Sequence, residues 1–168
     1  MRKEDWPERL MALIAERRSR PFAWGEQDCA LFACDAVAAM TGADPAAWFR
    51  GRYRTRRGAY ALLKRFVLLG LPSRRLAAPP GPSDSEPTLA VGRAGRRNEL
   101  LAEAWEQEAA ARGWPEIAPV FARRGDVALI DTANGEALAV CAGAAFAAAG
   151  PTGLLMAPLA AARRAWRI

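Results

Sequence analysis

One part of the chain has residue types and spacing that suggest covalent chemistry, and it is centred on Cys29. Asp28 precedes this cysteine, and the alanine-rich residues after it predict a helix that ends at Gly42. The Asp28 carboxylate is a good N-cap, because it can accept hydrogen bonds from the amides of residues 30 and 31. Cys29 then lies in the first helical turn, where the helix dipole favours a thiolate. The arrangement predicts either a nucleophilic cysteine or a small apolar residue packed at a helix start.

An aromatic loop, Pro-Phe-Ala-Trp-Gly, leads into this helix and ends at Gly25. Loop and helix together resemble the NlpC-type cell-wall cysteine peptidases, which have a papain-like fold, and more closely their short phage-tail relatives. In those peptidases the loop is Pro-Tyr-x-Trp-Gly and the helix opens with Asp-Cys. The matching residues here are Phe22, Trp24, Gly25, Asp28 and Cys29. The resemblance implies that Cys29 holds the nucleophile position and that Trp24 and Gly25 border a binding cleft.

The catalytic base of that family has no counterpart here, because the chain contains no histidine. The resemblance places the family's histidine, which opens a strand, at Ala137, and its oxyanion tyrosine at Phe22. A carboxylate such as Asp28 or Glu136 is conceivable as a partner for the thiol. However, a nearby carboxylate raises a thiol pKa, which works against activation. Peptidase activity is therefore not expected, unless an unrecognised base or one from another chain serves Cys29.

The resemblance extends over about residues 5–75 and 120–168. It implies a place in the virion of a phage or phage-derived particle, at the tail tip or baseplate hub. Without the histidine, the expected role is that of a structural pseudoenzyme, with other tail-tip proteins as partners and peptidoglycan as a further one. The alternative is an active cysteine peptidase or amidase that cuts peptidoglycan peptides through Cys29. The charged N-terminus lacks an apolar signal core, so we expect synthesis in the bacterial cytoplasm without a signal peptide.

Positive charge is concentrated in arginine. Lys+Arg 24 against Asp+Glu 18 gives a net charge of +6, which permits a polyanionic partner without requiring one. A second alternative is therefore a basic nucleic-acid-binding module. The simpler interpretation, which we prefer, is a solvated connection whose arginines pair with local acids. The arginines concerned are Arg50, Arg52, Arg54, Arg56 and Arg57.

Neither a metal nor another cofactor is predicted. The three cysteines lack metal-type pair spacing, and their odd number argues against a disulfide framework. No phosphate-loop glycine pattern followed by lysine is present. Residues 137–162 carry no charge, but glycine and proline interrupt them too often for one membrane-spanning helix. We therefore expect buried strands there, and no membrane span.

The order of elements predicts a single α+β domain over residues 1–168, with N-terminal helices packed on a C-terminal antiparallel sheet. Residues 78–116 have the composition of a linker and a polar helix, and they are predicted to be an insertion that contacts a partner or is a tolerated surface excursion. Helices are expected from an Asp5 cap to about Arg20, from Asp28 to Gly42, at 58–70, and at 98–112 after an Asn98 cap. Strands are expected at 125–130, 137–143, 144–149, 153–157 and 165–168.

Overall fold

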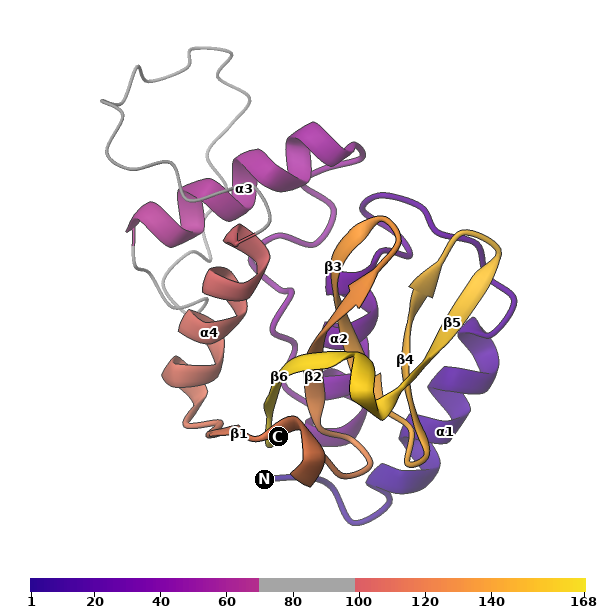
Figure 1. The fold of residues 1–168 in the computed structure, drawn as a ribbon. Helices are drawn as coiled ribbons and strands as arrows, with labels where there is room; N and C mark the ends of the chain where they lie inside the picture. Colours follow the sequence, from indigo (N-terminus) through magenta and orange to yellow (C-terminus); the bar gives the residue numbers. More distant parts are fainter. Residues whose placement is uncertain (70–98) are drawn as a thin grey trace.

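A computed structural model of the chain describes residues 1–69 and 99–168. Four helices and a six-stranded sheet make up this part of the protein (Figure 1). The helices are α1 (Trp6–Arg17), α2 (Cys29–Thr41), α3 (Arg56–Leu69) and α4 (Leu100–Arg112). The strands are β1 (Glu116–Ile117), β2 (Val127–Thr132), β3 (Gly135–Cys141), β4 (Ala145–Gly150), β5 (Gly153–Pro158) and β6 (Ala162–Trp166). Two short 3-10 helices, η2 (Pro119–Phe121) and η3 (Leu159–Ala161), flank the sheet strands.

The sheet has the order β1-β6-β2-β3-β4-β5, and every neighbouring pair is antiparallel. Strands β2 to β5 form a meander, and β6 returns to pair with β2. A two-residue turn at Ala133–Asn134 joins β2 to β3, with Thr132 opposite Gly135. The predicted α+β class, with helices first and an antiparallel sheet last, is confirmed.

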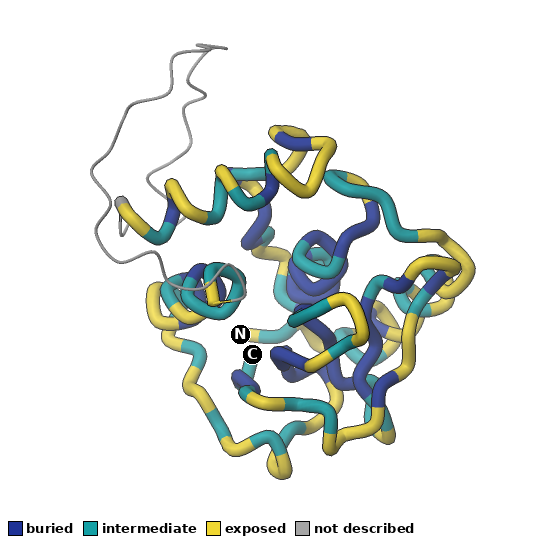
Figure 2. The backbone as a smooth tube through the Cα atoms, turned by 45° about the horizontal axis from the view of Figure 1, so that its top comes forward, coloured by how far each residue is buried: buried dark blue, intermediate teal, exposed yellow. Residues whose placement is uncertain are grey.

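Helix α2 is the centre of the domain, with α1 on one side and strands β3 and β4 on another (Figure 1). Gly42 ends it in the left-handed conformation at φ 81° and donates its N–H to Ala38. The sequence pattern predicted burial on one face only. In the structure Phe32, Ala33 and Ala36 are fully buried as well, because the helix has packing partners on more than one side (Figure 2).

The two faces of the sheet carry different cores, since side chains alternate along each strand. Larger apolar residues such as Leu129, Leu138 and Val140 share one cluster with α2. The opposite face is packed mostly with alanines, together with Ile130, Cys141 and Phe146, and we call this set the alanine cluster. Its buried members are Ala128, Ile130, Ala137, Ala139, Cys141, Phe146, Ala148, Ala157 and Ala165.

Helix α4 belongs to the main core. Trp105 is 4% exposed and shares the core cluster with α2, and its ring lies 6.5 Å from that of Trp166 on β6. Arg164 of β6 donates to Glu106 of α4 at 3.2 Å and to Glu116 of β1 at 2.8 and 2.6 Å. The helical part of the predicted insertion is thus packed against the sheet and α3 rather than projecting from the domain.

Several predicted helix boundaries need correction. Helix α1 ends at Arg17, and Asp5 makes no side-chain capping bond because its carboxylate accepts from Arg9 at 2.7 Å. Helix α3 begins at Arg56 rather than at residue 58. The hydroxyl of Thr55, just before the helix, accepts the Gly58 N–H at 3.1 Å and so caps this start. The end of this helix at residue 70 and the linker at 78–88 lie outside the described residues.

The fourth helix and the last strand differ from prediction as well. Helix α4 begins at Leu100, and its N-cap, Glu99, makes no side-chain capping bond. The predicted cap Asn98 lies outside the described residues. The final strand spans 162–166 instead of 165–168, and the two-residue strand β1 was not anticipated. The uncharged stretch at 137–162 lies mainly in β3, β4 and β5. Strands β3 and β4 are buried as expected, whereas β5 is not, since Leu155 and Met156 are 42% and 51% exposed. Throughout the described ranges, no helix combines the length and apolar character that a membrane crossing requires.

Candidate functional site

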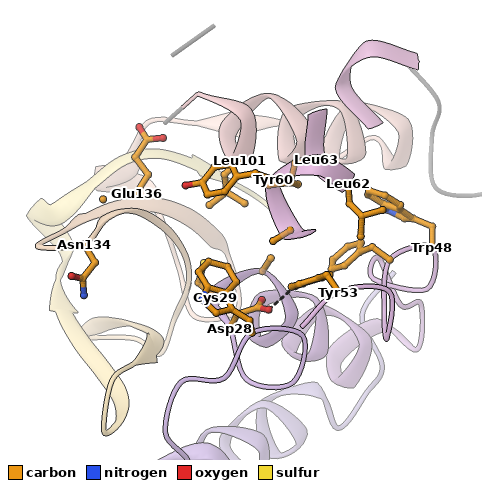
Figure 3. Close-up of a pocket in the computed structure, with 15 residues that line it drawn as sticks. Asp28, Cys29, Trp48, Tyr53, Tyr60, Leu62, Leu63, Leu101, Asn134 and Glu136 are labelled. Carbon is orange, nitrogen blue, oxygen red and sulfur yellow. Dashed lines mark hydrogen bonds between the residues drawn. The ribbon is translucent and has the colours of Figure 1, made fainter. Parts of the chain in front are cut away.

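Asp28 is the hydrogen-bonding centre of the site. Its Oδ1 accepts the Leu31 N–H at 2.9 Å, so only one of the two predicted capping bonds forms. Its Oδ2 accepts the Gly25 N–H at 2.9 Å and the Tyr53 hydroxyl at 2.5 Å (Figure 3). The side chain is 1% exposed. Both carboxylate oxygens are therefore engaged in holding the helix start, the aromatic loop and the 50s segment together.

Tyr53 is the partner that sequence analysis missed. Burial and the Asp28 carboxylate both raise the pKa of its hydroxyl, so the group stays a hydrogen-bond donor. The contact joins residues 25 positions apart in the sequence. The one indication of Tyr53 in the sequence is that it is an aromatic residue among the arginines of residues 50–57. The resemblance places the family's oxyanion tyrosine at Phe22, which has no hydroxyl. The Tyr53 hydroxyl nevertheless reaches this site, from the segment between α2 and α3.

The aromatic loop is fixed by a tight backbone approach. Gly25 has φ 77°, and a Cβ there would overlap the carbonyl oxygen of Tyr53. Ala23 and Gln27 exchange backbone hydrogen bonds of 2.8 and 3.1 Å, which close the loop before Asp28. Trp24 lines the cleft, as predicted, whereas Gly25 does not line it and instead donates to Asp28.

Cys29 is partly exposed where it lines the cleft, and its surroundings favour the protonated thiol. Burial raises its pKa from 9.0 to about 11, and the Asp28 carboxylate adds to the increase. Backbone N–H groups, including that of Leu138, oppose the shift without cancelling it. The expectation that the helix dipole would favour a thiolate is therefore wrong for this site, because desolvation and a neighbouring negative charge outweigh the dipole.

Ala137, the predicted position of the lost histidine, is 8% exposed and belongs to the alanine cluster. Cys29 packs against the same cluster. The carboxylate nearest in sequence, Glu136, lines the cleft and accepts from Arg163 at 3.3 Å. No basic nitrogen within the described residues is placed to take a proton from the thiol, and no group of His, Cys, Asp or Glu there is arranged to hold a metal ion.

A cleft lies above Asp28 and Cys29 (Figure 3). Its walls come from the aromatic loop, the 48–53 segment, helices α3 and α4, and the β2–β3 turn. Aromatic rings dominate these walls, together with three leucines on the helices. The rings are those of Trp24, Trp48, Phe49, Tyr53 and Tyr60, and the leucines are Leu62, Leu63 and Leu101. The arrangement is that of an apolar binding site with a neutral thiol at its base.

The sequence profile of the family described as "Domain of unknown function (DUF6950)" matches residues 1–74 and 92–168. The chain belongs to this family. No curated protein is significantly similar to the chain. The DUF6950 match includes all of α4, so this helix is part of the family pattern, and the match is interrupted only at residues 75–91.

The predicted arginine strip of this DUF6950 protein divides into two parts. Arg50 donates to Asp35 at 2.6 Å and to Asp44 at 3.0 Å, which confirms the expected pairing with local acids at this position. Arg54 lies 3.7 Å from Glu26 and is 83% exposed. The remaining members, Arg52, Arg56 and Arg57, make no ion pair within the described residues.

Proposed function

We propose that this protein is a non-catalytic structural component of the tail tip or baseplate hub of a phage or phage-derived particle. In this proposal its fold is a degenerate NlpC-type peptidase fold of the papain-like kind. A helix-capping Asp28 followed by Cys29, the loop ending in Trp24-Gly25, and a cleft above them support the resemblance in this part of the molecule. The virion location follows from the resemblance.

The observation that carries the non-catalytic role is the state of Cys29. A cysteine nucleophile needs a base within hydrogen-bond reach and a group that orients the base. Here burial and Asp28 keep the thiol neutral, since its pKa is raised to about 11. Asp28 itself is committed to three hydrogen bonds. With Ala137 in the position of the histidine, none of the described residues that line the cleft offers a basic nitrogen.

Release of stem peptides from purified peptidoglycan tests this proposal. We expect the wild-type protein and a Cys29→Ala variant to release equal, background amounts of peptide, measured by mass spectrometry of the soluble fraction. Release by wild type that disappears in the variant would establish the alternative, an active peptidase or amidase. A borrowed base is tested by repeating the assay with intact particles.

The virion location has its own test. Quantitative mass spectrometry of purified particles should find the protein in a fixed, small copy number relative to the other tail proteins. Its absence from particles that are complete by electron microscopy would refute the structural role, whatever the peptidoglycan assay shows.

A further inference from the structure

Two exposed arginines lie beside aromatic residues that line the cleft, since Arg54 follows Tyr53 in the chain and Arg56 lies over the Tyr60 ring. The guanidinium of Arg54 lies 3.7 Å from the Glu26 carboxylate of the aromatic loop. The guanidinium of Arg56 lies 5.6 Å from the centre of the Tyr60 ring, which lines the cleft. Neither arginine is held by a short ion pair, so both can reorient toward an arriving anion. We call Arg54 and Arg56, with the exposed Arg52 and Arg57 beside them, the basic rim.

The basic rim carries a local excess of positive charge. Its members make only one contact with an acidic group within residues 1–69 and 99–168, the long one between Arg54 and Glu26. Helix α3 adds the exposed cations Lys64 and Arg65 and has no acidic residue. The rim therefore favours negatively charged groups at the edge of the cleft.

The interior of the cleft has the opposite character. Its aromatic and leucine walls favour a bulky apolar group. The Asp28 oxygens are occupied, and Glu136 on the far wall is engaged by Arg163. An anionic group placed deep in the cleft would lose water without gaining a cationic partner, which is unfavourable, whereas the buried Oε2 of Glu136 has no hydrogen-bond partner and could accept from a donor. Peptidoglycan stem peptides, built from small and charged residues, would leave these aromatic walls unfilled.

We infer that the cleft is a docking site for a segment of another protein that places one bulky apolar side chain between the aromatic walls and sets Asp or Glu residues against the basic rim. This inference rests on the proposed function in one respect, since a neighbouring protein of the particle is the natural source of the segment. The apolar contact provides affinity, and the rim provides orientation and faster association.

Binding of fluorescein-labelled synthetic peptides, followed by fluorescence anisotropy, tests this inference. The panel has Trp, Phe or Leu flanked on each side by two Glu residues, with Gly-Ser ends. One control replaces the anchor with Ala, and another replaces Glu with Lys. We expect at least one bulky-anchor peptide to bind ten times more tightly than both controls, with affinity that falls as salt rises. No difference between the bulky and alanine anchors would overturn the inference.

Variants locate the site. Arg54→Glu/Arg56→Glu should weaken binding at least tenfold and reduce its salt dependence, and Tyr60→Ala should weaken binding while preserving the salt dependence. The matched control is Arg123→Glu/Arg124→Glu, with the same change in charge at exposed positions that precede β2, at the strand end away from the cleft. Equal losses in the rim variant and this control, with unfolding midpoints unchanged, would contradict the assignment.

Different experimental results would refute the inference and the proposed function. Tighter binding of a purified muropeptide than of every panel peptide would overturn the inference and favour a wall ligand. Release of stem peptides by wild type would refute the non-catalytic role while leaving the peptide-binding result intact.

Discussion

Removing the Asp28 carboxylate is expected to be among the most costly single changes in the described residues. In Asp28→Ala the helix loses its cap, which typically costs about 1 kcal/mol. The Tyr53 hydroxyl also loses a charge-assisted bond of 2.5 Å, in a class worth about 1.5–3 kcal/mol. The Gly25 N–H loses its acceptor as well, which adds about 1 kcal/mol. The free energy of unfolding should fall by about 3–5 kcal/mol in all.

Urea unfolding, with the slope of the transition compared between variants, measures this loss. Tyr53→Phe should cost about 2 kcal/mol, because it removes only one of the three bonds. Tyr60→Phe is the matched control, since that hydroxyl makes no hydrogen bond within the described residues, and its cost should stay below about 0.5 kcal/mol.

The double variant Asp28→Ala/Tyr53→Phe decides whether the two groups act together. If the hydrogen bond matters as described, the double variant costs little more than Asp28→Ala alone, and the coupling energy is near the cost of Tyr53→Phe. Strictly additive losses would refute the reasoning, and so would an Asp28→Ala loss below about 1 kcal/mol.

Four further predictions concern other features of the described residues. Gly25→Ala should lower the unfolding free energy by at least about 1 kcal/mol more than Gly51→Ala, because both glycines have φ 77° but only Gly25 faces a carbonyl; equal losses in urea unfolding would contradict the close approach. Trp105→Ala should cost about 3–5 kcal/mol, and a loss under about 1 kcal/mol would mean that α4 is a surface excursion after all. Iodoacetamide should alkylate Cys29 more slowly at pH 7.5 than it alkylates free cysteine, and the rate should rise toward pH 11. Peptide mapping identifies the alkylated cysteine. Fast alkylation of Cys29 at pH 7.5 would show that the thiol is ionised and would contradict the raised pKa. Because the pKa of Cys29 is raised, its contribution to the free energy of unfolding is present below pH 9 and is lost as pH rises through about 11. The free energy of unfolding of Cys29→Ser should therefore fall less steeply over this pH range than that of wild type. An equally steep fall in both proteins would contradict this prediction.

Features set by short stretches of sequence were predictable. Asp28 and Gly42 bracket α2 because capping depends on residues within one turn of the helix ends. The strand order in the meander follows from the short turn at Asn134. Asp126 closes the turn before β2, since its Oδ2 accepts the Arg123 N–H at 2.9 Å.

Features that depend on distant contacts were not predictable in the same way. Tyr53 reaches Asp28 only because the 43–55 segment folds back over the aromatic loop, and nothing in its neighbouring residues indicates that path. Helix α4 has charged residues around most of its surface, so its pattern gave little sign that Trp105 and Ala109 enter the main core. The thiol pKa of Cys29 likewise depends on burial, which local sequence does not determine.

The alanine cluster bears on how this lineage can evolve. On the proposed descent from a peptidase, recovery of activity would begin with Ala137→His, a change that takes two nucleotide substitutions or more. That position is 8% exposed, pairs directly with Ile130 on β2, and belongs to a cluster that also holds Phe146. An imidazole there would overpack the strands, at a typical cost of about 1–3 kcal/mol, before any catalytic benefit existed. Several neighbours would have to shrink or move first. The packing of this face therefore makes the loss of the base costly to reverse by a single substitution.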